Sequence, residues 1–251
     1  MGNNIKGKLK KNADLVLYFK PKLLKVLERT SLFLKVYKSG KMPKIINLLP
    51  NLKNFEEIIW LTRPDIWSDQ AIFSVTHSFL SKLDKNQMGR FFSLILAPRF
   101  QETIFNSNRY SSHIQKTMKM STRFPSVFFS SVFLPICESK SCSLKEGAVL
   151  GMILSNYHFN PSSILSVLVR LLKPPVTPVK CLLMRTILCK NYIIPHRTLD
   201  LLVDFFVSNR KKASFSQFRT FFIVFLKNYS IHLSSEDKRK IISTKNIRQE
   251  F

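Results

Sequence analysis

The sequence predicts an all-α fold in which antiparallel helices stack into a repeat-like α–α superhelix, of the kind formed by HEAT and TPR repeats. Prolines recur at intervals of 17 residues, at Pro161, Pro178 and Pro195, and Asn160 and Thr177 precede the first two. An N-cap residue followed by proline at the first helical position is a typical helix start. Units of one helix and one turn, repeated at constant length, indicate a stacked array. No stretch shows the two-residue alternation of a strand.

The N-terminal part divides into a basic, flexible arm over residues 1–20 and the start of a single all-helical domain over residues 21–251. A helix is expected from Pro21 onward, with a basic outer face and one apolar face. The apolar face is predicted to hold Leu23, Leu24, Leu27, Leu34 and Val36. The stretch KMPKIINLLP predicts a turn and a short helix, and residues 51–60 predict another helix.

The middle of the chain contains further helix boundaries. Ser68 is a candidate N-cap for a helix over residues 69–83, which carries an acid in its first turn where the helix dipole favours it. The next helix is expected over residues 87–97 and is predicted to stop before Pro98. Residues 99–121 predict one long, half-exposed helix, interrupted near residues 106–108.

The C-terminal half begins with a strongly apolar segment, residues 124–137, which predicts a buried helix leading into a turn. Ser143-Leu144-Lys145-Glu146 is a capping box that starts the next helix. Gly147 and Gly151 lie one turn apart in it, a spacing that indicates close approach of a neighbouring helix. Two more helices are expected, over residues 215–229 and 234–244.

The net charge is the most distinctive feature of the composition, with 40 basic against 15 acidic residues and a formal charge of +25. A field of that size attracts polyanions, among which phosphate backbones are the most common. Codon bias toward Lys, Asn, Ile and Phe is the alternative explanation, supported by 22 phenylalanines, and an acidic membrane surface is an alternative partner. No apolar run reaches the roughly 18 residues that span a bilayer. Four cysteines without an export signal suggest a reducing compartment, and we expect a soluble intracellular protein.

Motifs for catalysis or cofactor binding are not apparent. The six glycines form neither G-x-G-x-x-G nor G-K-[ST], so no phosphate-binding loop is predicted. Cys137, Cys142, His158, Cys181 and Cys189 could in principle form a zinc site, but structural zinc usually has two tight ligand pairs and the second pair is absent. We therefore favour the alternative, in which the cysteines are small apolar thiols near a turn. We therefore expect no enzyme activity, no cofactor, no metal and no small-molecule substrate.

Basic residues spread through the chain are the candidate RNA contacts, because a stacked array can gather them on one curved face. The alternative is a solvated, self-repelling surface. Trp60 and Trp67 are weighed as a base-stacking platform, with a core role preferred. The candidate cations are Lys22, Lys25, Arg63, Arg99, Lys180, Arg185, Lys190, Arg197, Arg210, Lys211 and Lys212.

Four blocks of the sequence resemble the successive blocks of the bystin family in order and spacing. They are KSGKMPKIINLLPNLKNFEEIIWLTRPDIWSDQAIF, MGRFFSLILAPRFQETI, FLPICESKSCSLKEGAVLGMIL and MRTILCKNYIIPHRTLDLLVDFF. The resemblance runs from about Gly40 to Phe206 and continues more weakly to the C-terminus. The CES–x–x–C–SLKE and K–x–Y–x–x–P–x–R–x–L–D blocks are the most distinctive.

The resemblance implies a nuclear and nucleolar factor, with shuttling to the cytoplasm left open. It implies an association with precursors of the small ribosomal subunit and a requirement in the processing of their rRNA. Its implied partners are precursor small-subunit rRNA, ribosomal proteins and other assembly factors, without a membrane or a catalytic role. Two hypotheses stay open: a scaffold that binds RNA directly, and an adaptor for peptides of assembly factors with no direct RNA contact.

Overall fold

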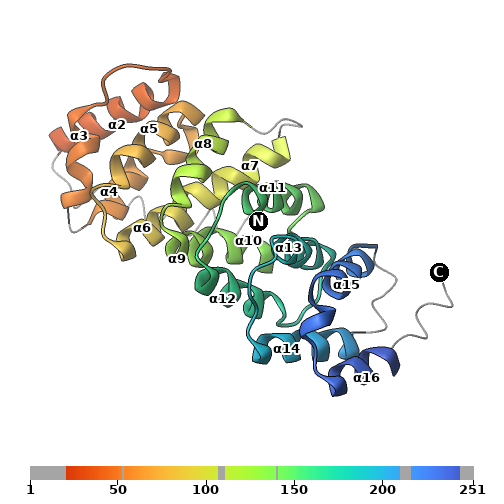
Figure 1. The fold of residues 1–251 in the computed structure, drawn as a ribbon. Helices are drawn as coiled ribbons and strands as arrows, with labels where there is room; N and C mark the ends of the chain where they lie inside the picture. The colour runs from red at the N-terminus through yellow and green to blue at the C-terminus, as the bar shows by residue number, and fades with distance from the viewer. Residues whose placement is uncertain (1–20, 53, 107–110, 140, 210–215, 244–251) are drawn as a thin grey trace. The chain divides into compact units, whose positions relative to one another are not determined.

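The computed structural model describes residues 21–52, 54–106, 111–139, 141–209 and 216–243. Within these ranges every regular element is helical, and no strand occurs among them (Figure 1). The predicted all-α class is confirmed. None of the helices in these ranges combines the length and the apolar character needed to cross a bilayer.

The chain divides into two compact units, residues 1–132 and residues 133–251. The single domain predicted over residues 21–251 and the repeat-like superhelix stay predictions, and the predicted arm over residues 1–20 lies outside the described residues.

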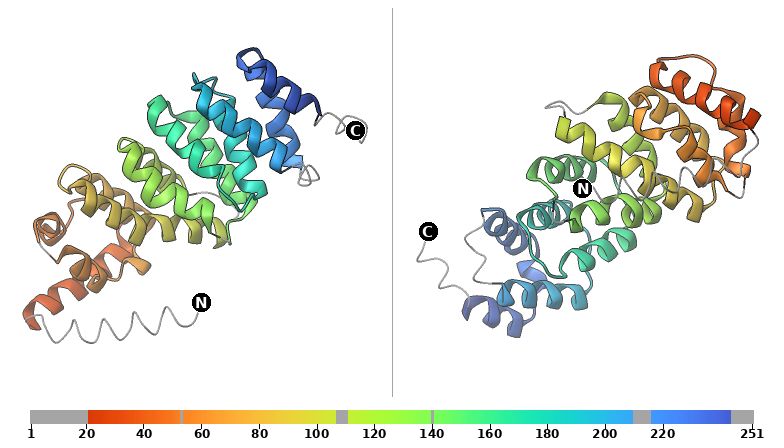
Figure 2. Two further views of the ribbon diagram at one scale, coloured as in Figure 1. Left: turned by 90° about the horizontal axis from the view of Figure 1, so that it is seen from below. Right: turned by 180° about the vertical axis from the view of Figure 1, so that it is seen from behind.

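The first unit consists of short helices with α2 at the start of its described part (Figures 1 and 2). Helix α2 packs on α4 and on the 3-10 turn η2, α5 packs on α8, and α6 packs on α9. The elements are α2 (Pro21–Val36), α3 (Lys44–Leu48), η1 (Leu49–Asn51), α4 (Phe55–Leu61), η2 (Pro64–Ile66), α5 (Asp69–Phe79), α6 (Lys85–Phe91), the π-helical η3 (Phe92–Leu96), α7 (Ala97–Asn106), α8 (Ser112–Ser121), α9 (Pro125–Phe128) and the π-helical η4 (Phe129–Phe133), in which the boundary between the units falls.

The N-cap prediction at Ser68 is confirmed. Its hydroxyl accepts a hydrogen bond from the Ala71 amide at 3.1 Å and donates one to the Tyr37 carbonyl at 2.7 Å. Helix α5 ends at Phe79 rather than near Leu83, and its side chains Ala71, Ile72, Val75 and Phe79 are buried. The cap therefore starts α5 and also ties it to the segment that follows α2.

The predicted helix end before Pro98 is wrong. The helical path continues from α6 through η3 into α7, where Pro98 is the second residue. Proline lacks the amide that an α-helix needs, but a π-helical turn changes the hydrogen-bond pattern in the turn before it. The same arrangement recurs at Pro135, which follows the π-helical η4. Helices containing these prolines therefore continue where a purely local rule predicts a stop.

The second unit contains the helices with the proline spacing. All three predicted helix starts are confirmed: Pro161 and Pro178 are first residues capped by Asn160 and Thr177, and Pro195 is the N-cap of the helix that begins at His196. The elements are α10 (Leu134–Glu138), α11 (Leu144–Asn156), α12 (Pro161–Leu171), α13 (Pro178–Leu188), α14 (His196–Ser208), α15 (Ser216–Tyr229), η6 (Ser230–His232) and α16 (Ser235–Ser243).

Helix α13 lies between α11 and α15 and packs on both (Figures 1 and 2). The predicted capping box at Ser143 is confirmed, with the Glu146 amide 3.2 Å from the Ser143 hydroxyl. The close approach predicted at Gly147 and Gly151 is also confirmed. A Cβ on Gly147 would lie 2.7 Å from Cγ1 of Val179, and one on Gly151 would lie 3.3 Å from Cδ2 of Leu182. The two glycines let α13 approach the backbone of α11.

Phenylalanine accounts for much of the core of the second unit. Phe206 lies in the middle of a cluster, with ring centroids 4.7 Å from Phe221 and 5.1 Å from Phe225. Aromatic pairs at such distances contribute beyond the area that they bury. The phenylalanines of this cluster therefore stabilise the core by packing, whether or not codon bias contributes to their number.

Candidate nucleic-acid interface

Eight of the eleven candidate cations lie in the described part of the chain. Arg210, Lys211 and Lys212 lie outside the described residues. The eight come from several elements of both units. The contacts of each side chain show which of them has its charge directed to solvent.

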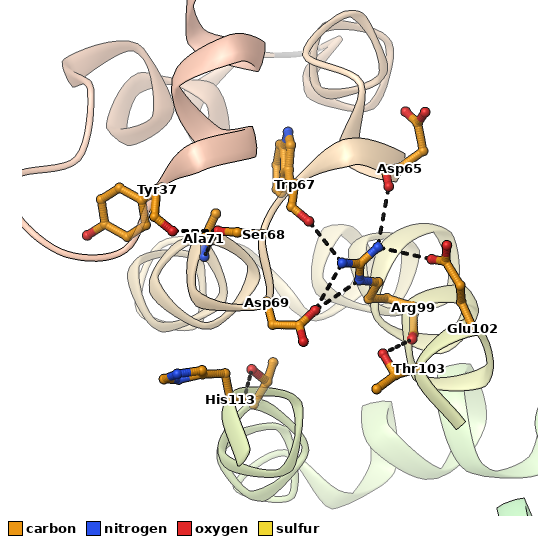
Figure 3. A network of polar contacts seen from close by, with 11 residues as sticks. Tyr37, Asp65, Trp67, Ser68, Asp69, Ala71, Arg99, Glu102, Thr103 and His113 are labelled. Carbon is orange, nitrogen blue, oxygen red and sulfur yellow. Dashed lines mark hydrogen bonds and ion pairs between the residues drawn. The ribbon is translucent and has the colours of Figure 1, made fainter. Parts of the chain in front are cut away.

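Arg99 is the most constrained of these cations (Figure 3). Its Nε and Nη2 atoms donate to the same carboxylate oxygen of Asp69, at 3.1 and 3.0 Å. Nη2 also donates to the Trp67 carbonyl at 3.1 Å, and Nη1 donates to Glu102 at 3.0 Å and more weakly to the Asp65 carbonyl at 3.4 Å. The guanidinium thus connects α7 to the η2–α5 junction.

Because only 21% of its side chain is exposed and two carboxylates neutralise it, Arg99 acts as a structural cross-link of the first unit. Asp69 also occupies the first turn of α5, where the dipole stabilises a carboxylate. The guanidinium of Arg99 is therefore occupied by groups of the protein itself and is not available to a phosphate.

Lys180 and Lys190 lie near the two ends of α13 and direct their ammonium groups toward the carboxyl ends of neighbouring helices. Lys180 is only 3% exposed and donates to the Lys173 carbonyl at 3.0 Å, just beyond the end of α12. Lys190 donates to the Tyr157 carbonyl, at the end of α11. Burial lowers the pKa of both lysines. They satisfy carbonyl groups that a helix end leaves unpaired, so we do not retain them as phosphate contacts either.

The remaining candidates of the first unit are accessible. Arg63 has a left-handed backbone, with φ of 50°, at the N-cap of η2. Its side chain is 65% exposed and forms a loose ion pair with Asp65 at 3.4 Å. Lys22 and Lys25 are exposed on the first turns of α2. Exposed pairs of this type contribute little to stability, so the Arg63 charge is available to another anion.

Two candidates of the second unit are also accessible. Arg185 is half-buried on α13, and Arg197 is exposed in the first turn of α14. Both therefore remain candidates for phosphate contact.

An ion pair that the sequence analysis missed joins α12 to α10. Arg170 donates to both carboxylate oxygens of Glu138, from Nε at 2.9 Å and from Nη2 at 3.3 Å. This hydrogen bonding lowers the pKa of the Glu138 carboxyl, with burial acting in the opposite direction. The partners are 32 residues apart, so no local spacing identifies them.

The base-stacking alternative is wrong for Trp67, which is 1% exposed. Its indole N–H donates to the Thr62 carbonyl at 2.9 Å, which fixes the turn between α4 and η2. Trp60 is half-buried at the end of α4. The preferred core role is therefore confirmed for Trp67.

Two of the four cysteines have the environment of packing residues, whereas Cys142 is half-buried and Cys189 is exposed. Cys137 and Cys181 are buried, and desolvation raises the pKa of the Cys137 thiol. Partial burial raises the pKa of Cys142 to about 11. A thiol with a raised pKa is a poor nucleophile at neutral pH. Among the described residues no three His, Cys, Asp or Glu side chains form a group that could hold a metal ion.

The fold and these contacts define an all-helical protein with exposed arginines and lysines and with several internal cations that support its helices. A sequence model of the Bystin family matches residues 3–250, and the chain belongs to the Bystin family. The resemblance carried by the four sequence blocks is thereby confirmed.

Curated relatives agree with this assignment. The chain is 31% identical to Bystin of Nematostella vectensis over 88% of its own length and 52% of the relative. It is 30% identical to Bystin of Monosiga brevicollis, over 88% of the chain and 54% of the relative. For Bystin of Homo sapiens the identity is 26%, over 88% and 51%. The chain spans about half the length of the curated relatives it matches.

Proposed function

We propose that this protein is a non-enzymatic ribosome biogenesis factor that binds precursor particles of the small ribosomal subunit as a scaffold. In this proposal it is needed for the processing and maturation of small-subunit rRNA and works in the nucleus and nucleolus. Its partners are precursor rRNA, ribosomal proteins and other assembly factors. The observation that carries the proposal is membership of the Bystin family, because the resemblance implies this role.

The charge of the chain supports direct contact with RNA. A formal charge of +25 favours a polyanionic partner. The accessible arginines Arg63, Arg185 and Arg197 are the residues that we propose for phosphate contacts, since arginine matches the geometry of phosphate oxygens. Lys22 and Lys25 differ from these arginines because they lie among exposed apolar side chains on α2.

Depletion of the protein in its own cells tests the biological role. Precursors of small-subunit rRNA should accumulate, and RNA blots with probes for the precursor and the mature species measure this. Normal processing and normal subunit levels in depleted cells would refute the proposal.

Binding of RNA to the purified chain tests the direct contact and separates it from the adaptor alternative. If the three arginines neutralise three phosphates, replacing them with glutamine should change the slope of log affinity against log salt by about 2 for single-stranded RNA. Lys180→Met is the matched control, because it removes a formal charge that is buried. An unchanged slope in the triple variant, or an equal loss in the control, would contradict these assignments.

The adaptor alternative is favoured by a different observation, the exposure of four large apolar side chains on α2, Val26, Leu32, Phe33 and Val36. These four side chains offer nothing to a phosphate backbone but suit a peptide. The two functions can belong to different faces of one molecule.

A further inference from the structure

Helix α2 is apolar on both of its sides. The inner side buries Leu27 and Leu34, at 1% and 0% exposure, and α2 packs on α4 and η2. The outer side leaves four large apolar side chains in solvent. They are Val26 at 45%, Leu32 at 64%, Phe33 at 41% and Val36 at 71% exposure.

The position of Val36 corrects the sequence prediction, which placed it on the buried side. A helix turns by about 100° per residue, so Val36 lies about 160° around the axis from Leu34 and faces outward. Val26 and Phe33 are seven residues apart, and Leu32 and Val36 are four apart. Both spacings align side chains along a helix. Leu32 and Val36 lie about 90° around the helix axis from Val26 and Phe33, and Lys25 and Arg29 continue the Leu32–Val36 row toward the start of α2. We call the four apolar side chains on this side of the helix the outer α2 strip.

Positive charge accompanies this strip. Lys22, Lys25, Arg29 and Lys35 are exposed on the same helix, against one exposed acid, Glu28. Isolated apolar residues are normal on a protein surface, but four large exposed apolar side chains on one side of a helix, with cations beside them, mark an interaction site. The combination is complementary to an acidic surface with an apolar stripe of its own.

Four kinds of partner could cover the outer α2 strip, and charge complementarity favours one of them. Residues 1–20 contain five lysines and one acid, so this segment repels the lysines and the arginine on the outer side of α2. A second copy of α2 would place like charges opposite each other. RNA would satisfy the cations, but three of the four apolar side chains are aliphatic and cannot stack on bases. An acidic amphipathic helix satisfies both the charges and the apolar side chains.

We propose that the outer α2 strip is a docking site for an acidic amphipathic helix of a partner protein. The partner helix places apolar residues at i, i+3 or i+4 and i+7 against Leu32, Phe33 and Val36. Its glutamates or aspartates pair with Lys25 and Arg29. This site does not depend on the proposed RNA contact, which involves other residues.

A designed peptide tests the site directly. The probe is a fluorescein-labelled helix of about five turns with leucines along one face and glutamates flanking them. Its anisotropy is measured against the full chain at low and moderate salt. One control peptide has lysine in place of glutamate, and another has serine in place of leucine. Binding of the acidic leucine peptide, with loss of binding by both controls, supports the site.

Variants of the protein locate the binding. The double variant Leu32→Ser, Val36→Ser should lower the affinity for the acidic peptide by at least about tenfold, as expected for central apolar anchors. The double variant Lys25→Glu, Arg29→Glu should also lower the affinity for the acidic peptide, and it should reduce the dependence of that affinity on salt. Ile223→Ser is the matched control, since Ile223 is 61% exposed on α15 of the other unit. Substitution of exposed side chains leaves the fold intact, which circular dichroism checks.

Several outcomes would overturn the proposal. Equal affinity in the strip variants and the Ile223→Ser control would show that the peptide binds elsewhere. Competition by a synthetic peptide of residues 1–20 would assign the strip to the chain itself, and strip-dependent dimerisation would assign it to a second copy. Loss of RNA binding in the strip variants, without peptide binding to the unmodified chain, would assign it to RNA.

Discussion

Replacement of Gly147 by alanine tests the packing of α11 on α13. The added Cβ would lie 2.7 Å from Cγ1 of Val179, whereas carbon atoms in contact lie about 3.5–4.0 Å apart. The overlap is about 1 Å with a side chain that is only 4% exposed and whose backbone belongs to a packed helix. Overpacking of this kind costs roughly 1–3 kcal/mol. Alanine recovers about 0.5–1 kcal/mol of helix propensity.

The net result expected for Gly147→Ala is a loss of about 1–2 kcal/mol in the free energy of unfolding. Urea titration followed by circular dichroism measures it, with an unchanged m value showing that the native state keeps its compactness. Gly151→Ala is the matched control. Its Cβ would lie 3.3 Å from the end of the Leu182 side chain, so its loss should be smaller.

A double-mutant cycle separates this clash from other effects. Val179→Ala alone leaves a cavity, but combined with Gly147→Ala it removes the atom that the new Cβ meets. The coupling free energy should therefore be favourable by about 1 kcal/mol or more. A Gly147→Ala protein more stable than the unmodified chain, with no coupling to Val179, would refute the packing argument.

Three further predictions concern charged groups. Arg99→Lys should cost about 2 kcal/mol of unfolding free energy in urea titration, because a single ammonium cannot reproduce the five contacts of the guanidinium; a change below about 0.5 kcal/mol would contradict its structural role. Arg170→Gln should lower the free energy of unfolding only slightly at pH 7, since the ion pair with Glu138 is exposed. The pKa of Glu138 is lowered in the folded chain, so the stability that the ion pair contributes is fully present above the pKa of the unfolded state, near 4.5. It is lost as the pH falls through the folded-state pKa. The unfolding curves of the variant and the unmodified chain should therefore converge in acid. Burial lowers the pKa of Lys180 by disfavouring its charged form, so here too the folded chain binds fewer protons than the unfolded chain. The unmodified protein should therefore gain stability relative to Lys180→Met as the pH rises from the folded pKa toward about 10.4, and parallel pH profiles of the two proteins would contradict this.

The N-caps were predicted correctly because each cap depends only on residues within one turn of the helix. Ser68, Ser143, Asn160 and Thr177 all cap the helices predicted to follow them, through an amide two or three residues away. The π-helical turn before Pro98 is the exception. Its geometry is not a property of the proline or of its immediate neighbours, so a rule based on the missing amide predicted a helix end.

The candidate site was predicted less well, because the exposure and the pairing of a charged side chain depend on residues that are distant in the sequence. Arg99 meets Asp69, 30 residues earlier, and Lys190 meets a carbonyl 33 residues earlier. Composition shows that many cations are present, but it cannot show which of them face solvent. The outer α2 strip was likewise missed, because the sequence marks a residue as apolar without showing which side of the helix is covered.

The sequence by itself determined the helical class, most helix starts, the glycine contact between α11 and α13, and the resemblance to bystins. These follow from short-range hydrogen bonding, from residue size and from the order of motifs. Tertiary structure alone decided that Arg99, Lys180 and Lys190 serve the interior while Arg63 and Arg197 remain at the surface. The physical reason is that burial and ion pairing are set by groups brought together from remote positions in the chain.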